Sequence, residues 1–304
     1  MQGRRYKAAT LLLTAVGLVG LSGAGCPGLW PRPDPFANLP PLLPPTPSLE
    51  QVIQVVNANN SQIRAFSAGN ARLSGTDIPT TLQATVNFER PMRLRLRGQT
   101  LPTGPEIDLG SNDELFWFWV RRNQPPATYY CRHEQFLASP VRRNLPVDPY
   151  WLVEALGIAE FDPALPHQGP FLLPGGQLEI RTVRETANGT MTKVTVIDGK
   201  HGLILQQRLY DGRNQLVATS TTGRYRREPA SGLFMPTVVQ IHSPATANSP
   251  ALSLEIQLGN VQINPPTLGM EQLWVMPLYE NSPPVDLCRP GNAPGSAMPT
   301  ASRR

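Results

Sequence analysis

A strict alternation of apolar and polar residues between positions 82 and 89 constrains the fold of this chain more than any other feature. The apolar positions are Leu82, Ala84, Val86 and Phe88, and polar residues fill the positions between them. A period of two is typical of a strand in an antiparallel sheet that is buried on one face only. After the dipeptide Arg90-Pro91, the pattern resumes with Met92, Leu94 and Leu96, so the sequence predicts a second strand of the same kind.

The second half of the chain is predicted to consist of hairpins. Turns are indicated by Asn188-Gly189, Asp198-Gly199 and Asp211-Gly212, which favour tight connections between antiparallel strands. Strands are expected near 178–185, 190–197, 202–210, 215–226, 234–242 and 251–262, which brings the expected total to ten or eleven. The 34 prolines and 25 glycines among 304 residues fit many turns and exclude a coiled coil or a mainly helical protein.

Two helices are expected to accompany the strands. Ser48 and Gln51 form a capping box before an apolar stripe, and Pro149 follows the candidate cap Asp148 at the start of a second helix that Gly157 would end. The stripes consist of Leu49, Val52, Ile53 and Val56 in the first helix and Trp151 and Leu152 in the second. Because a long antiparallel sheet twists and curls, the expected fold is α+β and mainly β: a curled, half-open antiparallel β-barrel with helices across its concave face.

The segment 115–120 is apolar on both faces, unlike the strands before it. It contains Trp117 and Trp119. A strand of this kind is either covered on both faces or faces a cavity.

The N-terminus has the features of an export signal. Arg4, Arg5 and Lys7 precede an apolar run that ends in small residues, and Cys26 follows directly. This resembles a bacterial lipobox, in which the cysteine is acylated, although Gly23 stands where leucine is usual. Ordinary secretion, with Cys26 as a bystander, is the alternative. Lipidation would place the protein in the cell envelope facing the periplasm, and Pro27 after the cysteine favours the outer over the inner membrane.

The sequence therefore divides into four predicted parts. Residues 1–25 are a signal peptide, 26–47 are a proline-rich tether after the lipidated cysteine, 48–288 are one folded body, and 289–304 are a disordered tail. If Cys26 carries lipid, Cys131 and Cys288 remain as a possible disulfide, with two free thiols as the alternative.

The formal net charge of +5 does not indicate a nucleic-acid-binding face. Three of the 27 basic residues lie in 1–25 and three in 289–304, and these ends contain no acidic residue. Residues 26–288 therefore hold 21 basic against 22 acidic residues, so the chain without its two ends is close to neutral.

The order of these features resembles the bacterial lipoprotein carrier and receptor family, LolA and LolB. The resemblance covers roughly 48–288. It is carried by the helix 48–66, the strand that begins Arg90-Pro91-Met92, the segment 110–118, Tyr210-Asp211-Gly212, Met235-Pro236, Asn264-Pro265-Pro266 and Val285-Asp286-Leu287.

The resemblance implies an incomplete barrel with helices as a lid and an apolar pocket for the acyl chains of lipids or lipoproteins. It also implies that Arg90 holds the lid closed through hydrogen bonds. The expected lining is Leu82, Val86, Phe88, Leu94, Leu96, Trp117 and Trp119, and the expected lid residues are Leu49, Val52, Ile53, Val56, Trp151 and Leu152. For each of these residues, an ordinary place in the core is the alternative.

No catalytic motif accompanies these features. The four histidines, His133, His167, His201 and His242, have no partner at a typical spacing, and no metal or cofactor motif is present. We therefore expect a protein that is not an enzyme and that uses no cofactor. The alternatives are an envelope sensor or scaffold that binds a protein with the same fold, and a secreted hydrolase whose catalytic residues come from distant positions.

Overall fold

We describe a computed structural model of the chain, which covers Phe36 and residues 39–139, 141, 149–186, 189–246, 250–266 and 270–289. The chain divides into two compact units, Met1–Leu39 and Pro40–Arg304. In the first unit the Leu39 amide donates to the Phe36 carbonyl at 2.9 Å. Cys26, the predicted signal peptide, most of the predicted tether and the predicted tail after Arg289 lie outside the described residues.

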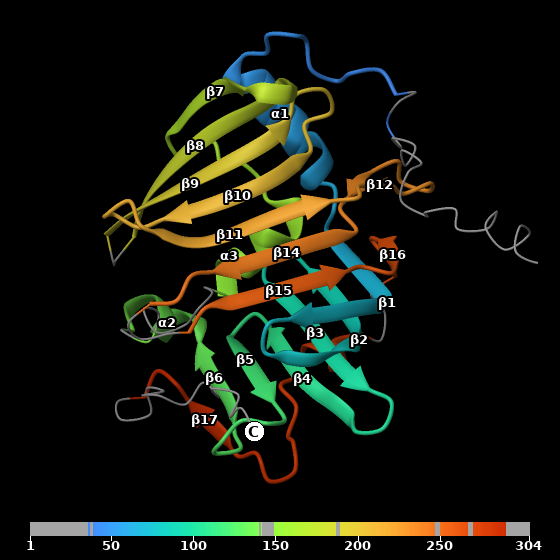
Figure 1. Cartoon of the computed structure of the whole chain (residues 1–304), viewed down its shortest axis with the longest axis vertical. Coiled ribbons are helices and arrows are strands. Elements are labelled where there is room, and N and C mark those ends of the chain that lie inside the picture. Colours follow the sequence, from blue (N-terminus) through green and yellow to red (C-terminus); the bar gives the residue numbers. More distant parts are fainter. Residues whose placement is uncertain are drawn as a thin grey trace, which may run out of the picture. The chain divides into compact units, whose positions relative to one another are not determined.

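The second unit is built on one 15-stranded sheet, which Figure 1 shows as a curled and unclosed layer. Its hydrogen-bonded order is β17-β6-β5-β4-β3-β2-β1-β15-β14-β11-β10-β9-β8-β7, with β16 paired to β1. The first-half strands are β1 (Ala65–Gly75), β2 (Ile78–Glu89), β3 (Arg93–Thr100), β4 (Gly104–Ser111), β5 (Leu115–Val120) and β6 (Thr128–Arg132). All pairings in this sheet are antiparallel except that of β17 (Pro284–Asp286) with β6.

The six strands expected in the second half are present, but two of them, 234–242 and 251–262, are divided, and the strand His167–Leu173 that precedes them was not predicted. The strands are β7 (His167–Leu173), β8 (Gln177–Thr186), β9 (Gly189–Asp198), β10 (Ile204–Tyr210), β11 (Leu216–Gly223), β14 (Val238–Ser243), β15 (Leu252–Gln257) and β16 (Asn260–Ile263), and a small ribbon pairs β12 (Arg226–Arg227) with β13 (Phe234–Met235). Pro236, which has no amide hydrogen, separates β13 from β14. Gly259 lies between β15 and β16. The chain passes so close to the backbone of Asn70 here that a Cβ atom would lie 2.5 Å from the Asn70 carbonyl oxygen, so the position requires glycine.

The first predicted helix is α1 (Leu49–Asn60), which ends before residue 66, the end of the segment predicted for it. The capping box is present: Ser48 Oγ accepts from the Gln51 amide, and the Gln51 side chain accepts from the Ser48 amide. The second is α3 (Pro149–Val153), which continues as the π-helical turn η2 (Glu154–Ile158). Gly157 lies inside η2 with φ of 81°, and Asp148 lies outside the described residues.

The short helix α2 (His133–Ala138) and the turns η3 (Pro174–Gly176) and η4 (Glu271–Trp274) were not predicted.

The end of the predicted tether packs on the folded body. The amides of Leu42 and Leu43 both donate to the Lys200 carbonyl, at 2.7 and 3.0 Å. The Leu43 side chain is buried in the same apolar cluster as α1. The body therefore begins several residues before Ser48.

The two faces of the sheet have different covers. We call the face that carries Val86, Leu94 and Val239 the inner face and the face that carries Arg95 and Asp108 the outer face. Figure 1 shows α1 behind β7–β11 and α3 behind β11 and β14, and both helices bury their apolar residues against the inner face. We call the C-terminal segment 271–288 the strap.

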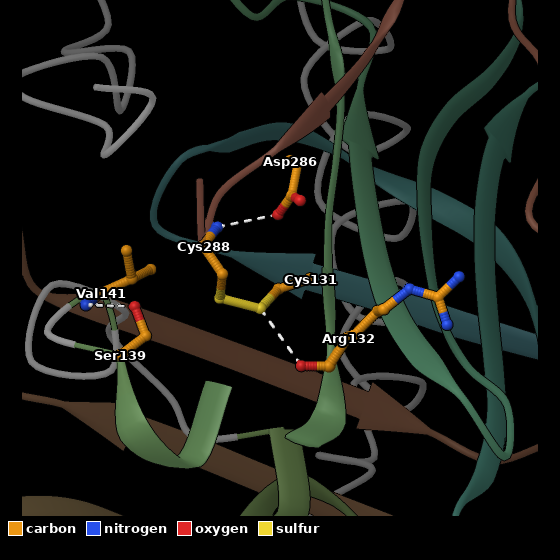
Figure 2. The surroundings of a disulfide bond; sticks show 6 residues. All are labelled: Cys131, Arg132, Ser139, Val141, Asp286 and Cys288. Atoms are coloured by element: carbon orange, nitrogen blue, oxygen red, sulfur yellow. Dashed lines mark hydrogen bonds between the residues drawn. A yellow bond between two sulfur atoms is a disulfide. The ribbon is translucent and has the colours of Figure 1, made fainter. Parts of the chain in front are cut away.

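A disulfide joins the end of the strap to β6. Figure 2 shows Cys131 bonded to Cys288. Their Cα atoms are 5.7 Å apart, and their separation in the sequence is 157 residues. The Cys288 amide donates to Asp286 Oδ1 at 2.9 Å. These two cysteines and Asp286 lie close enough to hold a metal ion, but the sulfurs are bonded to each other and offer no thiolate.

Candidate functional site

The residues predicted as lining on β2 and β3 lie together on the inner face. Each is at most 4 % exposed, and all belong to one apolar cluster: Leu82, Val86, Phe88, Leu94 and Leu96. The register explains this arrangement, because Val86 pairs with Leu96 and Phe88 with Leu94. Side chains of β14 and β15, including Val239 and Ile256, belong to the same cluster. Apolar residues from distant parts of the sequence therefore meet on the inner face.

The cover above this lining is α3 with η2. Trp151, Ala155, Leu156 and Ile158 are buried in the same cluster, and Leu152 packs against it. Trp151 and Leu152 therefore pack over the residues predicted as lining, and their role as part of a lid stays a prediction.

The first helix covers a different part of the inner face, which corrects the expected arrangement. Val52 and Val56 of α1 are buried, and Leu49 and Ile53 pack beside them. Their neighbours belong to β8, β9 and β10: Leu178, Ile180, Ile197 and Ile204. Gly202 permits this approach, because a Cβ there would lie 2.6 Å from Val55 Cγ1. α1 therefore covers the β8–β10 half of the face rather than Leu82 and its neighbours.

Arg90 joins the two covering helices. Its Nε donates to the Ile63 carbonyl at 2.9 Å, and its Nη2 donates to the carbonyls of Asn60 at 3.0 Å and Ile158 at 3.1 Å. Its Nη1 lies 2.8 Å from a Glu160 carboxylate oxygen. Helix C-termini leave carbonyls without intrahelical partners, and a guanidinium offers several donors in one plane. Arg90 thus binds the ends of both α1 and η2.

Three asparagines of α1 extend this attachment. The Asn57 side chain donates to the Phe161 carbonyl at 2.8 Å and accepts from the Phe161 amide at 2.9 Å. Asn59 makes the same two-way contact with the backbone of Phe234, at 2.9 and 2.8 Å. Asn60 donates to the Ala159 carbonyl at 2.7 Å. Their positions in the sequence did not reveal these roles.

Trp117 and Trp119 do not belong to the same lining as Leu94 and Leu96. Across β3, β4 and β5, the register pairs Leu96 with Leu109 and Leu109 with Phe118, so these three residues share one face. Trp117 pairs with Gly110, and Gly110 pairs with Arg95, so Trp117 shares the face of Arg95. Both tryptophans therefore lie on the outer face, and the expected lining is corrected at these two positions. Phe116 and Phe118 occupy the inner side of β5 instead, in a cluster with Tyr129 and Cys131.

The strap covers the outer face of β3–β6 around a buried ion pair. Arg95 donates to both carboxylate oxygens of Asp108, at 2.9 and 2.7 Å, and its Nη1 donates to two strap carbonyls. Tyr279 donates to Asp108 at 2.7 Å, and its ring stacks on Trp119 at 3.8 Å between centroids. Burial, followed by the hydrogen bond to Asp108, raises the pKa of Tyr279. The segment that is apolar on both faces is thus covered twice.

The histidines do not converge. His133 is buried with Nε2 3.3 Å from Ser111 Oγ and 2.9 Å from the Asn112 carbonyl. His167 contacts Thr182, His201 lies 3.3 Å from Asp198, and His242 lies at a surface groove with Thr219 and Glu255. Within the described ranges, no helix has the length and apolar character needed to cross a membrane.

Comparison with known proteins shows which solved structures share the fold of this chain. No family model and no curated protein matches the sequence. A solved domain from Vibrio parahaemolyticus, named for outer membrane lipoprotein sorting, matches with a TM-score of 0.50 at 11 % identity, over 74 % of this chain and 97 % of that one. The chain has a LolA/LolB-like fold. At this identity the likeness establishes the fold and not the cargo.

Two other solved structures are similar at lower scores. A LolA superfamily protein from Nitrosomonas europaea has a TM-score of 0.46 at 9 % identity, over 73 % of this chain and 96 % of that one. A DUF1329 family protein from Desulfovibrio piger has a TM-score of 0.46 at 12 % identity, over 75 % and 97 %.

Proposed function

We propose that this protein binds acyl chains of lipids or lipoproteins on the inner face of its LolA/LolB-like sheet, without catalysis. The observation that supports this most is the helical cover. Arg90, Asn57 and Asn59 hold α1 and η2 over two apolar clusters largely through polar contacts with backbone groups. Such contacts can break and re-form while the sheet beneath keeps its hydrogen bonds.

The energetics permit the cover to open for a ligand. Each hydrogen bond of the cover contributes about 1 kcal/mol net, because water replaces the lost partner. Burial of each methylene group gains about 0.8 kcal/mol. A long acyl chain that replaces the buried side chains of η2 therefore supplies free energy of the same order as the cost of opening. In the described structure the cover is closed and the apolar clusters are packed.

A non-catalytic role agrees with the geometry around Ser111. His133 Nε2 lies closer to the Asn112 carbonyl than to the serine hydroxyl. A ring nitrogen that faces a carbonyl carries the proton, so it is not available as a base for the serine. This argues against the secreted hydrolase.

We further propose that the body is tethered to a membrane of the cell envelope, facing the periplasm, by a lipid on Cys26, with the outer membrane favoured. The lipobox-like sequence and the proline-rich segment after it support the anchor. Changing Cys26→Ala in the full chain should abolish incorporation of a labelled fatty acid and release the protein from the membrane fraction. Labelling that persists in the variant would contradict the anchor.

The binding proposal is tested with a fluorescent hexadecanoyl probe and the full chain. Arg90→Leu should speed uptake of the probe several-fold, because it removes the contacts that join the two helices. Arg93→Leu is the matched control, since Arg93 pairs with Glu89 and Asp113 and contacts neither helix. If neither the wild type nor the variants take up the probe while a protein partner co-purifies, the sensor or scaffold alternative replaces this proposal.

A further inference from the structure

A row of polar side chains crosses the inner face beneath η2. Thr195, Gln207 and Ser220 lie side by side on β9, β10 and β11, because the register pairs Thr195 with Gln207 and Gln207 with Ser220. All three are at most 1 % exposed. Apolar residues continue the row at both ends, with Ile180 on β8 and Ile241 on β14. Buried polar groups in such surroundings are costly unless they are hydrogen-bonded.

The cover supplies oxygen atoms to this row. Gln207 Nε2 donates to the Glu154 carbonyl at 2.7 Å, and Ser220 Oγ donates to the Ala155 carbonyl at 3.1 Å. Two buried atoms of the row, Thr195 Oγ1 and Gln207 Oε1, have no hydrogen-bond partner among the described residues. The row therefore has more polar capacity than the closed cover uses: the Thr195 hydroxyl can donate or accept, and the Gln207 amide oxygen can accept a hydrogen bond from a ligand hydroxyl.

Two cations stand at the end of the row. Lys193 lies on the same face of β9 as Thr195, two residues away, and its Nζ is 2.7 Å from a Glu154 carboxylate oxygen. Arg184 of β8 approaches the other Glu154 oxygen at 4.0 Å. Lys193 is mostly shielded, with 13 % of its side chain exposed. A carboxylate of the cover is thus held against an ammonium and a guanidinium on the sheet.

We propose that this set of groups is a headgroup site for an acyl lipid with a negatively charged head, a carboxylate or a phosphate. The segment Glu154-Ala155 occupies the site when the cover is closed, with one carboxylate and two carbonyl oxygens in the place of the ligand's oxygens. When η2 lifts, Lys193, Gln207 and Ser220 become available to an anionic head while its chain lies on the apolar cluster. The inference rests on the proposed acyl binding and names the ligand class.

The negative charge proposed for the lipid headgroup follows from the departure of the Glu154 carboxylate when η2 lifts. Lifting η2 removes the anion from Lys193, and a mostly shielded ammonium without a partner is unfavourable. A neutral head leaves that ammonium unpaired, whereas an anionic head replaces the carboxylate and adds charge-assisted hydrogen bonds. The site therefore favours a charged lipid over a neutral one with the same chain.

The test compares three ligands with the same sixteen-carbon chain: hexadecanoate, hexadecyl phosphate and the neutral 1-hexadecanol. Affinities for the full chain are measured by competition with the fluorescent probe. Wild type should prefer both anions over the alcohol. Lys193→Met should reduce that preference about tenfold, the size expected for one charge-assisted hydrogen bond. Lys200→Met is the matched control, because Lys200 is exposed in the β9–β10 turn, and it should leave the preference unchanged.

Glu154→Gln should raise the preference for the anions, because it removes the competing carboxylate. The double variant Glu154→Gln, Lys193→Met removes both members of the shielded pair and leaves only Arg184, which is half exposed and can be solvated by water. It therefore keeps the test valid if Lys193→Met folds poorly, and it should show the reduced preference. Equal affinity of wild type for all three ligands, or an unchanged preference in the variants without Lys193, overturns the headgroup site and leaves the proposed function standing. Absence of binding by all three ligands overturns both. Of the two anions, the one that binds more tightly identifies carboxylate or phosphate as the preferred head.

Discussion

The sheet has a cover on each face, and the two covers are attached by different chemistry. On the inner face, α1 and η2 are held at their C-terminal ends by Arg90 and three asparagines, which contact mostly backbone groups. On the outer face, the strap is held by the buried pair Arg95–Asp108 and by the stacked rings of Trp119 and Tyr279, and its end is bonded to the inner side of β6 by the disulfide Cys131–Cys288. The first attachment is made of many weak contacts, and the second includes a covalent bond.

This difference separates a part that can move from a part that is fixed. Breaking the contacts of the strap leaves buried charges without partners, whereas Arg90, Asn57 and Asn59, which hold the inner cover, are partly exposed and can be solvated by water. In the proposed function the inner cover opens and the strap keeps β3–β6 in place. Four changes test this contrast, and their expected costs decrease in the order given.

The largest effect is expected from Asp108→Ala. The change leaves the Arg95 guanidinium, 6 % exposed, without its counter-ion and removes an acceptor from Trp117 and Tyr279. Unpairing a buried charge costs about 3–5 kcal/mol. Urea unfolding should show this loss. Asp113→Ala is the control: it removes the exposed partner of Arg93 and should cost less than about 1 kcal/mol. Similar costs for the two variants would contradict the fixed character of the strap.

Removal of the disulfide should have the next largest effect. The bond closes a loop of 157 residues, and loss of a native disulfide costs about 2–5 kcal/mol. We expect about 3 kcal/mol for the paired change Cys131→Ser, Cys288→Ser, since the other strap contacts remain. Unfolding in urea with and without reductant measures it. Probe uptake should stay as in the wild type, and faster uptake would mean that the strap also controls the inner cover.

Much of the fold was predictable because it is local. Alternation along β2 and β3 identified the buried residues, and Asn-Gly and Asp-Gly turns located the hairpins. The caps of α1 were also readable, since Ser48 and Gln51 act within three residues. The resemblance singled out Arg90, which contacts the ends of both helices, and its role in holding a lid closed stays a prediction.

The errors arose where distant pairing decides the outcome. The side of the sheet that Trp117 faces depends on the register of β4 with β5, and no pattern within 115–120 distinguishes its two faces. The position of α1 depends on Gly202, far along the chain. The asparagines bind backbone groups of 159–161 and 234, and backbone partners leave no pattern in the sequence.

A smaller effect is expected from the asparagines of the inner cover. Asn57→Ala and Asn59→Ala each remove a two-way contact with a backbone group and should cost about 1–2 kcal/mol. Hydrogen exchange should become faster in α1 and unchanged in β5 and β6. Asn112→Ala is the counterpart on the other face, because Asn112 donates to the Trp274 carbonyl of the strap, and it should leave α1 unchanged. Faster exchange throughout the chain would contradict an independent cover.

The smallest effect is expected at the other end of α1. Ser48→Ala removes the side chain that accepts from the Gln51 amide and should cost about 1 kcal/mol, the usual value of an N-cap. Exchange should become faster in the first turn only, since Asn57 and Arg90 hold the opposite end. If η2 alone admits the ligand, probe uptake stays at the wild-type rate, because the first turn packs over β8–β10 and away from Leu82 and Val86. Uptake as fast as in Arg90→Leu would instead mean that α1 swings about its asparagine-bound end, and the moving part of the cover would then be α1 rather than η2.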